Sequence, residues 1–258
     1  GGLHHALPGR ANGLCIYNDV AITAKYLVEK YHQRVMVIDT DAHHGDGTQW
    51  SFYTDNRIMT YSIHETGKFL FPGSGHYTER GEDIGYGYTV NVPLEPYTEN
   101  ASYLEVFKET VEPLVAAFKP DIILSVHGLD IHYRDPLTHM NCTLNSLYSI
   151  PYIIQDLAKR YCNHKVLMFG GGGYNIWRVV PRAWSHVFLS LIGEPIQRGY
   201  LPLNWINKWK LYSTVKLPKR WEDRLNDYAY IPRTKEISDK NLRIAKQVAS
   251  WYERYSYI

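Results

Sequence analysis

The chain has 258 residues, of which 45% are hydrophobic and 21% are charged, so a globular α/β domain with a sizeable core is expected. A net charge of +2 excludes a chain that is strongly basic or acidic throughout, but residues 195–258 carry 13 lysines and arginines against 6 acidic residues. We interpret this basic surplus as a solvated face rather than a site for an acidic partner. The sequence has no apolar run of membrane-spanning length, no signal peptide and no C-x-x-C pair among its three cysteines, which predicts a cytoplasmic protein without a membrane partner.

Short apolar runs, typical of strands, alternate along residues 19–192 with segments whose apolar residues recur at helical spacing. A helix is predicted over residues 19–32, where Asn18 and Asp19 supply an N-cap and apolar side chains recur at helical spacing. The elements predicted after it are strands at 35–38, 57–63 and 88–94, a helix at 101–118, a strand at 122–126, a helix at 145–161, a strand at 165–169 and a helix at 176–192. Strands that alternate with helices predict a mostly parallel sheet covered on both faces. Because Pro93 cannot donate a ladder hydrogen bond, it marks a strand end or an edge strand.

The pattern weakens after residue 194. Aromatic residues lie among lysines there, namely Trp205, Trp209, Tyr212 and Trp221. Such a mixture can bind single-stranded nucleic acid, but we favour rings that pack a long loop onto the domain. Residues 238–258 are predicted to form a final amphipathic helix. The domain organisation expected is therefore a catalytic domain at 1–194 and an extension at 195–258 that packs on it.

A cluster of polar residues follows the apolar run at 35–38, which reads as a strand buried on both faces. If strand geometry continues to residue 43, alternation places Asp39, Asp41 and His43 on one face, about 6.5–7 Å apart from one to the next. Gly45 and Gly47 place Asp46 in a turn. We therefore predict a site here rather than a solvated strand end.

Other polar residues also follow predicted strands. These are His64 to Phe71, Asp130, and Tyr174 after four glycines. In parallel sheets, ligands bind at the carboxyl ends of the strands, so the polar clusters are expected to form one site.

Asp41, His43 and Asp130 have the chemistry of a metal site. Three protein ligands leave a divalent metal one open position, as in catalytic zinc sites, where bound water becomes acidic. An oxygen-rich set also accepts Fe²⁺, Co²⁺ or Mn²⁺. Spacing alone supports Asp130 least, because a lone aspartate at a strand end is more often not a ligand.

Acid–base chemistry needs further groups. His4 and His5 are adjacent, and Asp39 and Asp46 are carboxylates that the metal does not need. A His–Asp hydrogen bond fixes the tautomer of the ring and raises its basicity, although a tandem His in a loop also occurs without function. Tyr174 could donate its hydroxyl to an oxyanion, while the glycines before it could alternatively form a tight turn or bind an anion. The sequence contains no G-x-S-x-G motif and no P-loop.

Four motifs, GGLHHA, DTDAHHGDG, FPGSG and GGGGY, resemble the zinc-dependent histone deacetylase superfamily of the arginase–deacetylase fold, over residues 1–193. GLDIHYRDPLTHM is most similar to the bacterial acetoin-utilisation deacetylases. The resemblance implies a three-layer α/β sandwich in which Zn²⁺ is bound at the three residues Asp41, His43 and Asp130. It makes His5, paired with Asp46, the general base and acid, and His4, paired with Asp39, its electrostatic partner. Tyr174 would polarise the acetyl carbonyl.

The resemblance also implies a substrate tunnel and a second ion. Gly13 and Phe71 would form the walls of the tunnel and Leu137 its rim. Leu14 stands where the family usually has an aromatic wall, which would widen the range of acyl groups. A structural K⁺ would lie near Asp39, Asp41, His43, Ser62 and Ile63. Because the chain starts at the catalytic histidines, the N-terminal part of the family fold is expected to be missing.

The function implied is hydrolysis of an acetyl-lysine amide to lysine and acetate in acetoin and acetate metabolism, with acetyl-CoA synthetase as a candidate substrate. One alternative is an amidohydrolase for acetylpolyamines or other small molecules. An arginase-like manganese hydrolase is disfavoured, since Ile131-His132 offers no Asp two residues after Asp130. A binding module without turnover is disfavoured by the presence of His4, His5 and Tyr174.

Overall fold

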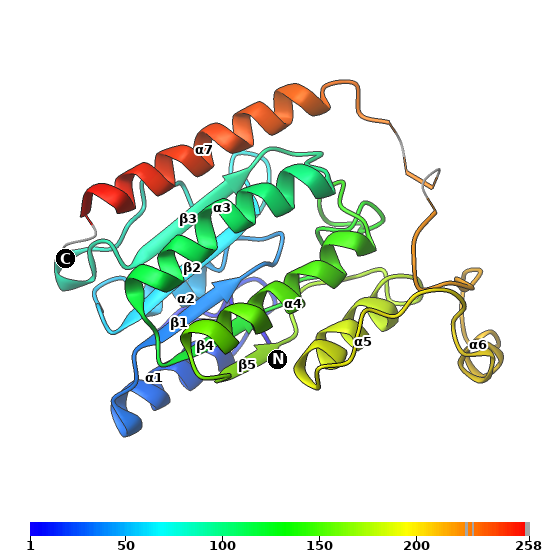
Figure 1. Cartoon of the computed structure of the whole chain (residues 1–258), viewed down its shortest axis with the longest axis horizontal. Coiled ribbons are helices and arrows are strands. Elements are labelled where there is room, and N and C mark those ends of the chain that lie inside the picture. The colour runs from blue at the N-terminus through cyan, green and yellow to red at the C-terminus, as the bar shows by residue number, and fades with distance from the viewer. Residues whose placement is uncertain (225–226, 229, 256–258) are drawn as a thin grey trace.

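The computed structural model describes residues 1–224, 227–228 and 230–255. Its centre is a five-stranded sheet with the order β3-β2-β1-β4-β5, in which all neighbours pair in parallel (Figure 1). The strands are β1 (Val35–Asp39), β2 (Ile58–Glu65), β3 (Thr89–Leu94), β4 (Ile122–Val126) and β5 (Val166–Phe169). The predicted parallel α/β sheet is therefore confirmed. The strand that contains Pro93 lies at an edge, as its missing N–H requires.

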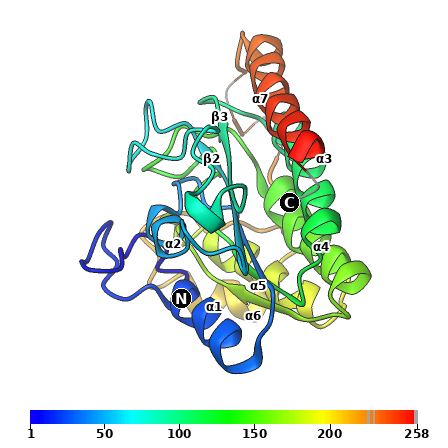
Figure 2. The ribbon, with the colours of Figure 1, turned by 90° about the vertical axis from the view of Figure 1, so that its left-hand side faces the viewer.

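Helices cover both faces of the sheet (Figure 2). One face carries α1 (Asp19–Tyr31) and the short α2 (Asp46–Ser51). The other carries α3 (Asn100–Phe118) and α4 (Leu144–Tyr161), with α5 (Val180–Leu191) beside α4. The long α7 (Thr234–Tyr255) runs along α3 and β3, whereas the short α6 (Leu203–Trp209) has no buried residue. A 3₁₀ turn, η1 (Asp83–Gly85), precedes β3.

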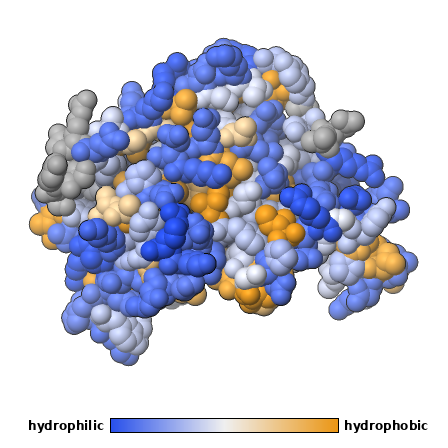
Figure 3. All heavy atoms as spheres, viewed as in Figure 1, coloured by the Kyte–Doolittle hydropathy of each residue, from blue (hydrophilic) through white to orange (hydrophobic). Residues whose placement is uncertain are grey.

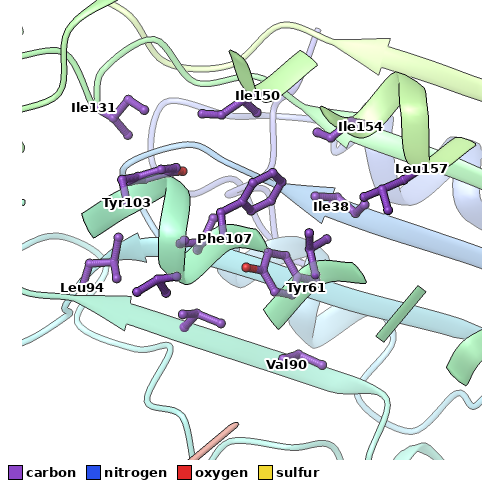
Figure 4. Close-up of a cluster of buried hydrophobic side chains, with 14 of the residues drawn as sticks. Ile38, Tyr61, Val90, Leu94, Tyr103, Phe107, Ile131, Ile150, Ile154 and Leu157 are labelled. Atoms are coloured by element: carbon purple, nitrogen blue, oxygen red, sulfur yellow. The ribbon is translucent and has the colours of Figure 1, made fainter. Parts of the chain in front are cut away.

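The side chains of β1 alternate between two hydrophobic cores. Met36 and Ile38 join the larger core under α3 and α4, and Val35 and Val37 pack toward α1. Figure 4 shows the larger core, in which Ile38 belongs to one cluster with side chains of β2, β3, α3 and α4. On the outer surface of this helical face, hydrophobic residues form separate patches among hydrophilic ones (Figure 3). A central strand with two buried faces is held firmly, so the chain that leaves its carboxyl end starts from a fixed point.

Asn18 connects the N-terminal loop to the start of α1. Its side-chain oxygen caps the helix by accepting from Ala21 N at 2.9 Å. Its amide group donates to the carbonyls of His4 and Ala6, at 3.2 and 3.3 Å. Thr48 N of α2 also donates to His4 O, at 3.1 Å. The tandem histidines are thus held between two helix starts.

Some predicted elements differ from the structure. β1 ends at Asp39, so strand alternation does not orient Asp41 and His43, and Asp46 begins α2 instead of occupying a turn. The helix predicted from residue 176 begins at Val180, because the carbonyl and side chain of Asn175 hold residues 178–180 in a turn before it. α6 was not predicted. The final helix begins at residue 234 rather than 238, and its predicted end at 256–258 lies outside the described residues.

Among the helices that the structure describes, none combines the length and the hydropathy needed to cross a bilayer.

Candidate active site

The three predicted metal ligands lie together at the carboxyl ends of β1 and β4. These strands are neighbours in the sheet, so the bend after β1, with Asp41 and His43, meets the loop after β4, with Asp130. His43 Nδ1 lies 2.9 Å from Asp130 Oδ2 and 3.1 Å from Asp41 Oδ1. All three residues are buried, and one ligand atom from each lies within 4.8 Å of the others.

Backbone N–H groups orient the two carboxylates. Ala42 N donates to Asp130 Oδ1 at 2.9 Å, and Gly172 N donates to Asp41 Oδ2 at 2.5 Å. Gly172 belongs to the four glycines after β5, and a side chain there would displace the carboxylates. A Cβ on Gly172 would lie 2.2 Å from Asp130 Oδ2. The glycines therefore let the backbone approach the carboxylates closely enough to bind them.

This donor set fits a divalent metal ion. Burial and the neighbouring Asp41 raise the pKa of Asp130, so two adjacent carboxylates are unfavourable here without a cation. Burial alone would lower the pKa of His43, but hydrogen bonds to Asp130 and Asp41 raise it to about 11. The two buried carboxylates thus favour positive charge at the point where the three side chains converge. Ligand atoms about 2.0–2.1 Å from a tetrahedral metal lie roughly 3.3 Å apart, close to the separations observed.

Two buried His–Asp pairs lie beside the cluster. His4 Nδ1 is 2.7 Å from Asp39 Oδ2, and His5 Nδ1 is 2.6 Å from Asp46 Oδ1. The two rings are 4.0 Å apart between centroids. Burial opposes charge on His4, yet Asp39 and Asp41 raise its pKa to about 9. Burial, together with the charge of His4, lowers the pKa of His5. The pairs therefore differ electrostatically, with His4 the more basic of the two histidines.

Two of the four residues predicted for the tunnel, Gly13 and Phe71, lie against His5. A Cβ on Gly13, whose φ is +50°, would lie 2.6 Å from the His5 ring, so this backbone is in direct contact with it. The half-exposed Phe71 ring meets His5 edge-on at 5.0 Å between centroids. Leu137 is half-exposed, and Leu14 is 96% exposed. The structure thus places Gly13 and Phe71 against His5, while the Leu14 side chain faces solvent.

A network that the sequence analysis missed holds the loop of Phe71. His44 Nδ1 lies 2.8 Å from Ser74 Oγ, and its Nε2 lies 3.0 Å from Gln49 Oε1. Gln49 donates to Glu79 at 2.7 Å, and Glu79 accepts from the backbone N–H of Gly75 at 3.0 Å. The sequence signals were the second histidine of the His43-His44 pair and the FPGSG motif, which contains Ser74 and Gly75. Gln49 and Glu79 belong to no recognisable motif.

Tyr174 follows the four glycines, and its side chain is 43% exposed. Burial and the nearby Asp41 raise its pKa to about 12, which keeps the hydroxyl protonated at neutral pH. Its backbone N–H donates to Asp135 at 2.9 Å. The sequence analysis gave Asp135 no role, although it lies in the GLDIHYRDPLTHM stretch, because a single aspartate in a loop does not indicate its partners.

Asp39 and Ser62, two of the residues predicted to surround K⁺, are neighbours across β1 and β2. Asp39 is in register with Ser62, whose hydroxyl lies 2.8 Å from His64 Nδ1. Asp39 Oδ1 accepts from Asp41 N at 3.1 Å. The K⁺ site itself stays a prediction.

These residues form a candidate centre for a catalytic divalent metal on a parallel α/β fold. A family model for the histone deacetylase domain matches residues 1–191. The chain belongs to the histone deacetylase family.

Relatives and solved structures agree with this assignment. The acetoin utilization protein AcuC of Staphylococcus aureus (strain COL) is 79% identical over 253 residues, a match that covers 98% of this chain and 65% of the relative. AcuC of Bacillus subtilis (strain 168) is 49% identical over 242 residues, covering 93% and 62%. A crystal structure of an HDAC homolog from Aquifex aeolicus superposes with a TM-score of 0.79 at 27% identity, over 93% of this chain and 66% of that one. The chain thus spans about 65% of the length of the first of these curated relatives.

Proposed function

We propose that the protein hydrolyses the amide of an acetylated lysine to lysine and acetate, with Zn²⁺ bound by Asp41, His43 and Asp130. The observation that carries the proposal is the position of this three-residue cluster beside the His5–Asp46 pair. Membership of the histone deacetylase family supports it. Fe²⁺ or Co²⁺ could take the place of Zn²⁺, because the ligands are oxygen-rich.

Three residues of the chain would each have a separate role in the hydrolysis of the amide. When bound, Zn²⁺ supplies Lewis acidity and makes a water molecule acidic enough to react at neutral pH. His5 donates its Nδ1 proton to Asp46, so Nε2 is free to take a proton from the attacking water and to deliver it to the leaving amine. His4, paired with Asp39, would supply positive charge close by. Tyr174 would donate its hydroxyl to the carbonyl oxygen as negative charge develops on it.

Gly13 and Phe71 would line the channel for the lysine side chain, since both lie against His5. Leu137 would contact the substrate at the rim. Leu14, which the family resemblance places opposite Phe71, faces solvent, and we propose that the channel would therefore admit acyl groups larger than acetyl.

The wider role proposed is deacetylation of a metabolic enzyme such as acetyl-CoA synthetase in acetoin and acetate metabolism, in the cytoplasm. The printed name of the relatives, acetoin utilization protein, supports this context. We also propose that residues 195–258 extend the catalytic domain of residues 1–194, because α7 packs along α3 and β3.

Metal removal tests the reaction class. Incubation with a chelator should abolish acetate release from an acetyl-lysine peptide, and one equivalent of Zn²⁺ per chain should restore it, since the three-residue donor set would hold one cation. Acetate release is measured before and after metal is returned. Turnover that persists in the metal-free protein would rule out the proposed chemistry. A metal-loaded protein that acts only on acetylpolyamines would reassign the substrate.

Tyr174→Phe tests the oxyanion donor. Loss of one such hydrogen bond should lower kcat by about 10²–10³-fold, with Zn²⁺ content unchanged because Tyr174 is not a ligand. Tyr133→Phe is a matched control, since that hydroxyl accepts from Arg134 Nε outside the metal cluster. An unchanged kcat in Tyr174→Phe would remove the hydroxyl from the mechanism.

A further inference from the structure

Asp135 links two loops that the proposed function uses. Its Oδ2 accepts from Tyr174 N at 2.9 Å, and its Oδ1 accepts from Leu137 N at 3.0 Å. The side chain is buried at 8% exposure, although both of its partners are about half-exposed. One carboxylate thus fixes the backbone of the proposed oxyanion donor and that of the proposed substrate rim. Hydrogen bonds to an ionised carboxylate are stronger than those between neutral groups.

The loop that carries Asp135 is itself well anchored. The carboxylate of Glu65, at the end of β2, accepts from His139 N at 2.8 Å and lies 2.7 Å from His139 Nδ1. Cys142 N donates to Ile131 O at 3.2 Å. The segment between the metal ligand Asp130 and α4 is therefore fixed to the sheet independently of Asp135.

The segment that carries Tyr174 contains conformationally free residues next to the tyrosine. It follows four consecutive glycines, and Gly173 has a φ of +144°, a conformation open to glycine. Gly172 is tied to the metal site through Asp41, but the Tyr174 side chain is too exposed for packing alone to place it. The N–H of Tyr174 itself donates to Asp135. An error of about 1 Å in the position of the hydroxyl can cost about 10²-fold in rate.

We propose that Asp135 is a positioning residue that sets the Tyr174 hydroxyl relative to the substrate rim at Leu137. It touches neither metal nor substrate and acts through the two backbone N–H groups that it binds. This proposal rests on the proposed function, because the proposed function assigns Tyr174 the role of oxyanion donor.

A double-mutant cycle tests whether Asp135 acts through the Tyr174 hydroxyl. Asp135→Asn keeps the size of the side chain but leaves one acceptor oxygen for two N–H groups. The remaining bond from Asn175 Nδ2 to Arg134 O, at 3.1 Å, still joins the two loops. In the zinc-loaded protein kcat should fall about 10–100-fold with metal content unchanged. In the Tyr174→Phe background, the same substitution should change kcat by less than about threefold. Equal losses in both backgrounds would overturn the proposal.

Amide hydrogen exchange gives a readout that does not depend on turnover. Asp135→Asn should speed exchange at the N–H groups of Tyr174 and Leu137, and leave that of Gly172, which is bound to Asp41, unchanged. Asp121→Asn is a matched control, because Asp121 also accepts a backbone N–H, that of Arg34 at 2.8 Å, at the opposite end of the sheet. Unchanged exchange at Tyr174 would refute the role of Asp135.

These outcomes separate the two proposals. Inactive wild-type protein on every acyl peptide would refute the proposed function, and the exchange measurement would still decide whether Asp135 holds Tyr174. If Asp135→Asn does not fold, Asp135→Ser is used instead in the double-mutant cycle and in the exchange measurement. Serine keeps one acceptor oxygen in a smaller side chain, and the expected results are the same.

Discussion

Replacing Gly172 by alanine should abolish metal binding and, with it, turnover. The added Cβ would lie 2.2 Å from Asp130 Oδ2 and 2.8 Å from Asp41 Oδ2. Both oxygens belong to side chains that can rotate away, so we expect the fold to survive and the ligand geometry to be lost. Groups that orient metal ligands typically change metal affinity by 10–100-fold, and a direct clash should cost about 10²-fold or more. Zinc content after dialysis and the unfolding temperature measure the two effects separately.

Gly9→Ala is the matched control for this substitution. Gly9 lies in the N-terminal loop, and a Cβ there meets no atom within 4 Å. Zinc content and turnover should equal those of the unsubstituted protein. If Gly172→Ala retained a full equivalent of tightly bound zinc, Asp41 and Asp130 could not both be ligands in the arrangement described.

The second large effect is expected from His5→Ala. The imidazole is the proposed group that moves the proton, and positioned acid–base groups contribute about 10²–10⁴-fold to rate. Its Nδ1 is bound to Asp46, which also accepts from Asn12 at 2.9 Å, so the carboxylate keeps a partner after the substitution. kcat should therefore fall within that range while zinc remains bound. Single-turnover acetate release and metal analysis on the same sample measure both.

His76→Ala controls for the loss of a histidine as such. This exposed ring pairs with Thr78 Oγ1 at 2.7 Å in the loop after Gly75. Its removal should leave kcat unchanged. The assignment of His5 would be wrong if His5→Ala retained wild-type kcat, and its role would be structural if the variant lost its zinc.

Much of the fold could be predicted because the pattern of apolar and polar residues along a short stretch of sequence is enough to identify a strand or a helix. The apolar run at Val35 marks a strand buried on both faces, and the stripe after Asn18 marks a capped helix. Alternation of such elements leaves few topologies other than a covered parallel sheet. One predicted boundary, the start of α5, was wrong because the Asn175 side chain competes with the helix.

The sequence by itself determined the family, the parallel sheet and the chemical types of the site residues, because these depend on residue order and motif spacing. Only the tertiary structure decided how the side chains converge. Asp41 and His43 leave the strand in a bend, and Asp130 reaches them because β1 and β4 pair. Gln49, Glu79 and Asp135 have partners about 30 to 40 residues away in the chain. A hydrogen bond between distant loops leaves no local periodicity, so the tertiary structure alone shows which carboxylate holds Tyr174.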